Sequence, residues 1–272
     1  MLATFVEMFS YDFILRALVV GSLVSLCSAL LGVSLVLKRY AMIGDGLSHV
    51  GFSAIAIAMV FNLAPLYVAI PVVVMAAFLL LRLTENSKLH GDAAIAMIST
   101  GTLALGVFAI SVTKGMNVDM NSYMFGSILA MDKSDVTLSI ILSVLVLCLF
   151  IVFYNRIFAV TFDENFAKAT GIRVDLYNGL IALLSAVTIV LGMRMMGALL
   201  ISSLIIFPAL SVMQLFKSFY QVVVSAALLS IICFILGLCL SYFWATPTGA
   251  SVVLVNMAAF GCFYGLGVLR QQ

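Results

Sequence analysis

The 272-residue chain is 65% hydrophobic and only 9% charged, with a mean hydropathy of +1.28. Ordinary soluble domains carry about 25% charged residues, so this chain lacks the polar surface that a water-soluble fold needs. Its formal net charge of +2 gives no indication of a nucleic-acid partner. The composition excludes the soluble protein classes and predicts an all-α fold, a polytopic transmembrane helical bundle.

The apolar segments are long enough to cross a bilayer nine times. A bilayer core about 30 Å thick needs roughly 20 apolar residues per helix. A further apolar piece, Tyr123–Met131, is too short to span and is interpreted as a re-entrant or broken helix. We therefore expect about 8–10 helices in a single transmembrane domain over residues 1–272. The predicted spans are 12–37, 41–62, 65–83, 92–113, 136–154, 175–192, 196–216, 220–243 and 250–269.

The positions of Lys and Arg predict the orientation, because cytoplasmic loops carry an excess of both. With the N-terminus outside, four cations fall on the outer face: Arg16, Lys114, Lys133 and Arg194. Nine fall on the inner face: Lys38, Arg39, Arg82, Lys88, Arg156, Lys168, Arg173, Lys217 and Arg270. Residues 1–11 hold no Lys or Arg, and no small-residue cleavage site follows the first apolar run, so we expect this span to stay in the mature protein.

The polar segments are too short for a soluble domain. The longest are 84–91, 114–122 and 155–175, and no Walker-type glycine-rich loop is present. The chain can therefore bind, gate or conduct, and any ATPase must be another polypeptide. In the last span, Gly261-x-x-x-Gly265 has the spacing that lets helices approach closely. Packing within the chain is the simpler interpretation, and a dimer interface is the alternative.

The inner segment 161–173 (TFDENFAKATGIR) has the signals of a short, self-capped helix. Thr161 and Glu164 have the spacing of a capping box, which predicts a helix start at Thr161. Glu164 and Lys168 form an i,i+4 pair in the favourable order. Gly171 can end the helix in the left-handed conformation. We expect two to three turns on the cytoplasmic face.

A helix this short is marginal in water, so other groups must pack against Phe166 and Ala167. The membrane surface or the chain's own loops are one possibility. A cytoplasmic partner into which the helix docks is the other.

An ionisable pair lies in the second span, in the stretch GDGLSHVG. Asp45 and His49 are four residues apart and share a helix face, and Ser53 continues the same stripe. Each ionisable residue inside a span costs at least ~2.5–3.5 kcal/mol on insertion scales and usually lines a pathway or pairs with another. The predicted span places Asp45 only about one turn from the inner boundary, which is shallow for a central site.

Three roles are open to the pair. The first is structural: an Asp–His hydrogen bond, or Asp45 as a helix N-cap. The second is intramembrane proteolysis with Ser53. Two absences argue against it: there is no HExxH motif, and there is no GxGD motif because Met42 takes the position of its first glycine. The third is a transition-metal site, since carboxylate and neutral imidazole suit Zn²⁺ or Mn²⁺. A site with only two ligands binds its ion loosely, as transport requires. Two copies of the chain could together form a site with four ligands.

The segment LKRYAMIGDGLSHVGFSAIAIA (37–58) is similar to the signature of permease subunits of ABC-type zinc, manganese and iron importers. Three later segments resemble the same family in the same order: YMFGSILA (123–130), DENFAKATGIRV (163–174) and GALLISSLIIFPA (197–209). The resemblance covers nearly the whole chain.

This resemblance implies a type II importer fold, like that of the cobalamin and siderophore importers, in the bacterial cytoplasmic membrane. It implies a homodimer of permeases, two cytoplasmic ATP-binding subunits and an extracytoplasmic metal-binding protein. It places the permeating cation at Asp45 and His49, with no permanently bound cofactor and with lipid around the bundle. The ATPase would engage a coupling helix at Thr161–Gly171, through Thr161, Asp163, Glu164, Phe166, Lys168 and Gly171.

The stretch HVGFSA resembles the zinc branch of the family, so we expect zinc first, manganese second and iron third. The delivery protein would dock where Asp119, Asp132 and Asp135 give local negative charge, although solvated loop acids are the simpler interpretation. The alternative function is an ion-coupled secondary transporter or channel that acts without an ATPase. Such transporters often have inverted repeats, and no such repeat is recognisable here.

Overall fold

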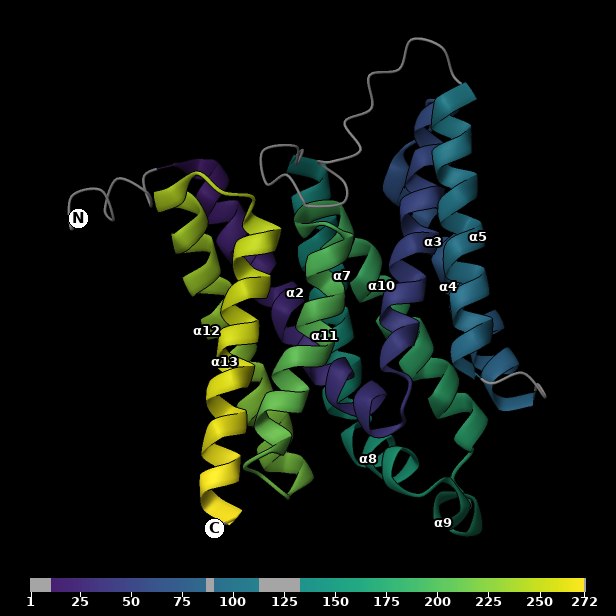
Figure 1. Cartoon of the computed structure of the whole chain (residues 1–272). Helices are drawn as coiled ribbons and strands as arrows, with labels where there is room; N and C mark the ends of the chain where they lie inside the picture. Colours follow the sequence, from purple (N-terminus) through teal and green to yellow (C-terminus); the bar gives the residue numbers. More distant parts are fainter. Residues whose placement is uncertain (1–10, 87–90, 113–132, 272) are drawn as a thin grey trace.

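The computed structural model describes residues 11–86, 91–112 and 133–271, and every element within these ranges is an α-helix (Figure 1). The helices are α2 (Asp12–Leu37), α3 (Ala41–Val60), α4 (Pro65–Asn86), α5 (Gly91–Val112), α7 (Lys133–Val152), α8 (Tyr154–Phe162), α9 (Glu164–Ala169), α10 (Val174–Met196), α11 (Ala198–Met213), α12 (Phe219–Trp244) and α13 (Thr248–Gln271).

The predicted membrane helices are confirmed. Within the described ranges, eight helices are long and apolar enough to cross a membrane, and α11 is a shorter apolar helix. Together they match the nine predicted spans, and no end differs by more than four residues. The predicted broken helix at Tyr123–Met131 lies outside the described residues. The chain is a multi-pass membrane protein.

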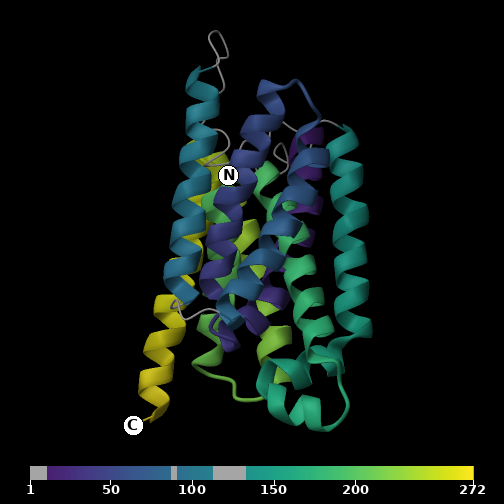
Figure 2. The ribbon, with the colours of Figure 1, turned by 90° about the vertical axis from the view of Figure 1, so that its right-hand side faces the viewer.

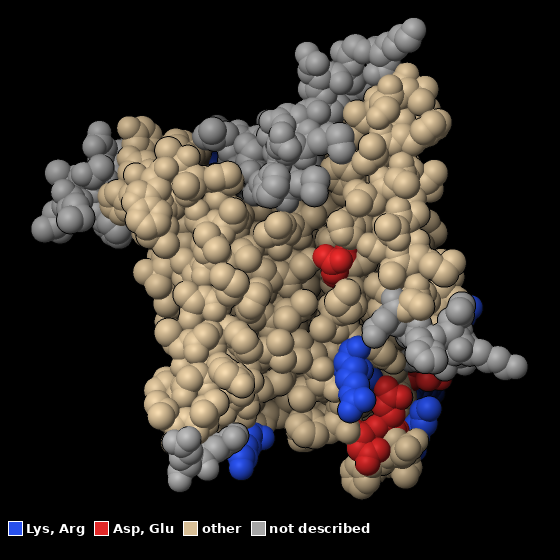
Figure 3. Space-filling view, viewed as in Figure 1, with Lys and Arg blue, Asp and Glu red and all other residues tan. Residues whose placement is uncertain are grey.

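The connections between helices alternate between the two ends of the bundle (Figure 1). The α2–α3 turn, helices α8 and α9, the α11–α12 turn and the end of α13 lie at the lower end in this view. Figure 3 shows charged side chains gathered at this end and a mostly uncharged surface above it. The lower end therefore corresponds to the predicted cytoplasmic face.

Helix α3 does not begin level with its neighbour α10. A Cβ added at Gly51 of α3 would stand 2.6 Å from the Cε atom of Met193. Gly51 lies ten residues after Ala41, whereas Met193 lies nineteen residues after Val174. At 1.5 Å per residue, α3 starts about 14 Å further from the cytoplasmic end than α10. Asp45 thus lies near the level of the middle of α10, further from the cytoplasmic end than its distance from Ala41 alone indicates.

The helices form a buried inner layer and an exposed outer layer. Helices α2, α3 and α10 are mostly buried inside the chain, whereas α5, α7 and α13 have few buried residues. In Figure 2, α5 and α13 lie on one side of the bundle and α7 on the other. No described atom lies within 4 Å of a Cβ added at Gly261 or Gly265, so the expectation that this α13 motif packs within the chain is wrong.

Candidate functional site

Helix α3 brings Asp45 and His49 together, as their spacing predicts. The distance from Asp45 Oδ2 to His49 Nε2 is 3.6 Å, and the side chains are 43% and 24% exposed, respectively. The N-cap of α3 is Tyr40, and Asp45 is the fifth residue of the helix. The N-cap interpretation of Asp45 is therefore wrong, and its carboxylate is free to face outward from α3.

Ser202 of α11 is a third member of the site, which the sequence interpretation did not include. Its hydroxyl donates a hydrogen bond to Asp45 Oδ1 over 3.3 Å and is also 3.4 Å from the Ala198 carbonyl oxygen. The signal that could have found it is the segment 197–209, which resembles the same family. Asp45 is thereby held through one oxygen, and its other oxygen faces His49.

Ser53 does not join the site. Its hydroxyl donates to the carbonyl oxygens of His49 and Thr102, so it links α3 to α5. Gly106 lies directly opposite, where a Cβ would stand 2.8 Å from the Ser53 Cα atom. The serine thus packs two helices together, which argues against its proposed role as a protease nucleophile.

One chain supplies few metal ligands. No group of three or more His, Cys, Asp or Glu side chains that could hold a metal occurs among the described residues. Asp45 and His49 together offer a carboxylate and an imidazole, which suit a divalent transition metal. Two such groups can bind a cation transiently, and further ligands must come from elsewhere for tighter binding.

The predicted cytoplasmic helix exists, but it starts later than the sequence suggested. Thr161 is buried within α8, and Asp163 is the N-cap of α9, where its Oδ1 atom accepts a 2.9 Å hydrogen bond from the Phe166 backbone N–H. The prediction of a capping box starting at Thr161 is therefore wrong, because aspartate at the next eligible position caps the helix. Gly171 has φ +82°, which confirms the left-handed end.

Glu164 turns toward the α2–α3 turn rather than toward Lys168. Its Oε1 atom lies 2.6 Å from Lys38 Nζ and accepts a 3.2 Å hydrogen bond from Asn178 Nδ2. Burial raises the pKa of the Glu164 carboxyl, but the hydrogen bonds from Lys38 and Asn178 and the charges of Lys38 and Lys168 outweigh it, so the pKa is lowered overall. The predicted Glu164–Lys168 pair is replaced by a contact between distant segments.

Helix α9 leaves an aromatic side chain open to the cytoplasmic side. Ala167 is buried against a small cluster that includes Val160 and Tyr177. Phe166 is 64% exposed, and Lys168 is exposed as well. The chain itself therefore covers only one side of α9, and Phe166 and Lys168 remain available for contact with another molecule.

At the opposite end of the bundle, Asp135 is not a free acid. Its Oδ2 atom lies 2.9 Å from Arg194 NH2, and both side chains are largely buried. Asp135 belongs to the first turn of α7, so it is neither a solvated loop residue nor a source of net negative charge. The other two predicted outer acids, Asp119 and Asp132, lie outside the described residues.

Comparison with known proteins identifies relatives over almost the whole chain. The high-affinity zinc uptake system membrane protein ZnuB of Haemophilus influenzae is 30% identical over 250 residues, covering 92% of this chain and 96% of that protein. The manganese transport system membrane protein MntC of Halalkalibacterium halodurans is 28% identical over 256 residues, covering 94% of this chain and 88% of that protein. A chain in the solved structure of PsaBC from Streptococcus pneumoniae in complex with Fab gives a TM-score of 0.87 at 27% identity, covering 97% of this chain and 95% of that chain.

These relatives confirm the family resemblance seen in the sequence. They are transport subunits, and the fold of PsaBC matches the helical bundle described above. Residues 10–264 match the family described as the ABC 3 transport family. The chain belongs to the ABC 3 transport family, as a membrane permease of an ABC transporter.

Proposed function

We propose that this chain is the permease subunit of an importer for a divalent transition metal and that Asp45 and His49 contact the ion during its passage. The Asp45–His49 pair carries the proposal, with side chains 3.6 Å apart and partly exposed. Each ionisable group at this depth costs at least ~2.5–3.5 kcal/mol, a penalty that a pathway function explains. Ser202 supports the same role because it orients one oxygen of the carboxylate.

Zinc is the proposed substrate, manganese the second choice and iron the third. The relatives named for zinc and for manganese have similar identities to this chain, so they do not separate the two metals. The presence of an imidazole favours zinc, because divalent affinity for such sites follows the Irving–Williams order. An extracytoplasmic metal-binding protein would deliver the ion and set much of the selectivity.

A second copy of the chain would complete the site. Two copies related by a two-fold axis would contribute two carboxylates and two imidazoles, which is a full ligand set for zinc. The exposed Asp45 carboxylate supports this arrangement, as does the open α13 surface at Gly261 and Gly265. Helix α11 packs against both α3 and α13 and so connects the site to this surface.

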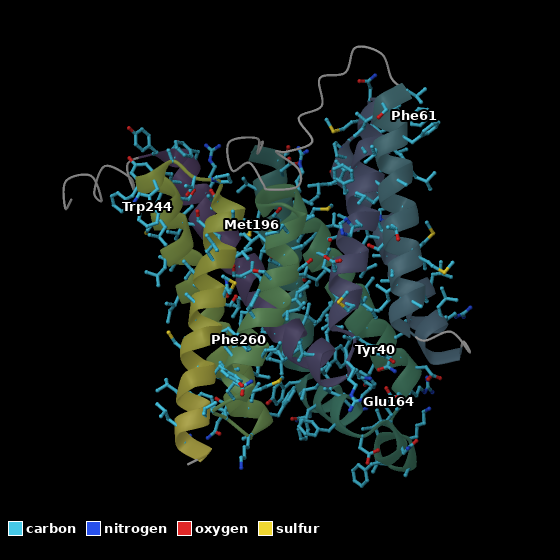
Figure 4. All side chains as sticks on the ribbon, viewed as in Figure 1. Tyr40, Phe61, Glu164, Met196, Trp244 and Phe260 are labelled. Atoms are coloured by element: carbon cyan, nitrogen blue, oxygen red, sulfur yellow. The ribbon has the colours of Figure 1, made fainter. Side chains whose placement is uncertain are left out.

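An ATP-binding subunit would engage the cytoplasmic end at α9. Figure 4 shows Glu164 at this end, and the neighbouring Phe166 is exposed. An exposed aromatic side chain beside a cation has the composition of an interface anchor. Movement of α9 by the ATPase would then alternate access to the metal pair.

The decisive experiment is uptake of radiolabelled zinc and manganese by cells that express the chain with its ATP-binding subunit. We expect Asp45→Asn and His49→Ala to lower uptake at least tenfold at equal expression. The control is Asp12→Asn, which removes an acid whose side chain is 86% exposed at the opposite end of α2. Wild-type uptake of both metals in both site variants would contradict the proposal, and uptake without ATP hydrolysis would favour a secondary transporter.

A further inference from the structure

The Lys38 side chain is clamped between two segments that are distant in sequence. Its ammonium nitrogen lies 2.6 Å from Glu164 Oε1 and donates a 2.5 Å hydrogen bond to Asn178 Oδ1. Asn178 closes the triangle, because its amide donates a hydrogen bond to Glu164. The Lys38 side chain is 6% exposed and Asn178 is 3% exposed. A buried ammonium held by a carboxylate and an amide resists separation from either partner.

This clamp joins α9 to the α2–α3 turn, which leads into the helix that carries Asp45 and His49. It also joins α9 to α10, which leads to the helix that carries Ser202. Lys38 follows the last residue of α2, and a three-residue turn, 38–40, leads into α3. A 2.8 Å hydrogen bond from the Tyr40 N–H to the Leu35 carbonyl holds that turn. Asp45 follows within the second turn of the same helix. The α2–α3 turn therefore cannot shift without moving the N-terminal part of α3.

The second connection runs through α10. Asn178 lies in the second turn of α10, and Gly197 links this helix to α11. Ser202, which donates to Asp45, lies in the first turns of α11. The contacts of Lys38 thus lead from α9 to both sides of the Asp45 carboxylate.

Space for movement exists beside the clamp. An open cleft of about 790 Å³ is lined by Tyr40, Arg82, Glu164 and Asp175, among others. Figure 4 shows Tyr40 and Glu164 near one another at the cytoplasmic end. A displacement of α9 toward α4 would enter this cleft without first breaking the apolar core.

We infer that the Lys38–Glu164–Asn178 clamp transmits displacement of α9 to the Asp45–His49 pair, with Lys38 and Glu164 as positioning residues for transport. This inference rests on the proposed function, in which an ATP-binding subunit moves α9. A clamp of this kind makes metal transfer depend on the cytoplasmic partner, because the α2–α3 turn moves together with α9.

The test uses the full-length chain in complex with its ATP-binding subunit, reconstituted in liposomes. Lys38→Met and Glu164→Gln remove one partner each, and the exchange Lys38→Glu with Glu164→Lys restores the opposite charges. Lys217→Gln is the matched control, a cation at the same end that lines a different cleft. Zinc uptake, manganese uptake and ATP hydrolysis are measured per folded complex.

We expect both single variants to lower the amount of metal taken up per ATP hydrolysed at least tenfold. The exchange should recover a substantial part of uptake. A structural role alone would lower the amount of folded complex and leave uptake per complex unchanged, which would overturn the inference. If Lys38→Met does not fold, Glu164→Gln decides the question, because its side chain is 41% exposed.

A second readout separates failure of the clamp from failure of the proposed function. Met42 of α3 is 51% exposed and lies one turn before Asp45, so the maleimide reaction rate of Met42→Cys, in a chain without the native cysteines, reports on α3. We expect a non-hydrolysable ATP analogue to change this rate at least threefold, and the change to disappear in Glu164→Gln. An equal rate change with and without Glu164→Gln would overturn the inferred role of the clamp. No rate change in the complex that carries only Met42→Cys would count against the proposed function itself.

Discussion

The Ser202 hydroxyl of α11 donates a hydrogen bond of 3.3 Å to the Asp45 carboxylate of α3. The two residues are 157 positions apart, and their contact joins α3 and α11 beside the Asp45–His49 pair. Because Ser202 holds Oδ1 while Oδ2 faces His49, the carboxylate has a defined orientation. The site therefore consists of two candidate ligands and one residue that orients the Asp45 carboxylate.

Removal of the Ser202 hydroxyl should weaken metal uptake without abolishing it. A typical hydrogen bond contributes about 1 kcal/mol, so we expect Ser202→Ala to raise the half-saturating metal concentration about fivefold. Ser203→Ala is the control, since the neighbouring Ser203 hydroxyl is buried without a partner in the described part of the chain. Equal uptake kinetics in the two variants would show that Ser202 has no orienting role.

Gly32 should tolerate no side chain, because α2 and α11 touch there. A Cβ at Gly32 would overlap the carbonyl group of Ile205, whereas none of the described atoms lies within 4 Å of a Cβ at Gly101. Overpacking costs about 1–3 kcal/mol, so we expect Gly32→Ala to lower the thermal unfolding temperature in detergent. Gly101→Ala should leave it unchanged or raise it. Similar unfolding temperatures would contradict the close approach of the two helices.

Phe166 should contribute to ATPase binding and not to folding. Exposed aromatic anchors typically contribute 2 kcal/mol or more at an interface, so Phe166→Ala should weaken binding of the ATP-binding subunit by roughly thirtyfold. Phe61→Ala is a matched control, because Phe61 is 67% exposed at the opposite end of the bundle (Figure 4). Co-purification of the subunit and its measured affinity check the prediction, and undiminished binding by Phe166→Ala would contradict it.

The proposed dimer should form through the α13 side of the bundle. Cys262 on α13 and Cys148 on α7 are both free and exposed, and Figure 2 shows these helices on opposite sides. Each of two chains retains one native cysteine, Cys262 or Cys148. A membrane-permeant bifunctional thiol reagent should cross-link the Cys262 chain into dimers and leave the Cys148 chain monomeric. The reverse result, read on a denaturing gel, would place the second copy on the α7 side.

Glu164 should make stability depend on pH in the acidic range. Its pKa is lowered in the folded chain, so its contribution is present above the ordinary glutamate pKa of about 4.3 and is lost as pH falls through the lower folded value. Because the side chain is 41% exposed, we expect a contribution below about 1 kcal/mol. The difference in unfolding temperature between wild type and Glu164→Gln should shrink below pH 4.3. A difference that grows with acidification would contradict the assignment.

The local features of the chain could be predicted from the sequence because they depend on neighbours along a single segment. Apolar length predicts the positions of the membrane helices, and four-residue spacing predicts that Asp45 and His49 share a helix face. Gly171 ends α9 in the left-handed conformation because glycine alone adopts it readily. The start of α9 was missed because Thr161 and Asp163 are both eligible caps. The burial of Thr161 within α8 decided between them.

Contacts between distant segments were decided only by the tertiary structure. Glu164 had a local partner in Lys168, but it pairs with Lys38, which lies 126 positions away and whose ammonium is buried between α9 and α10. The depth of Asp45 depends on how far α3 is shifted along α10, and helix packing sets that shift rather than any residue of α3 alone. The sequence by itself determined which groups could bind a metal, and the packing determined where they lie and what holds them.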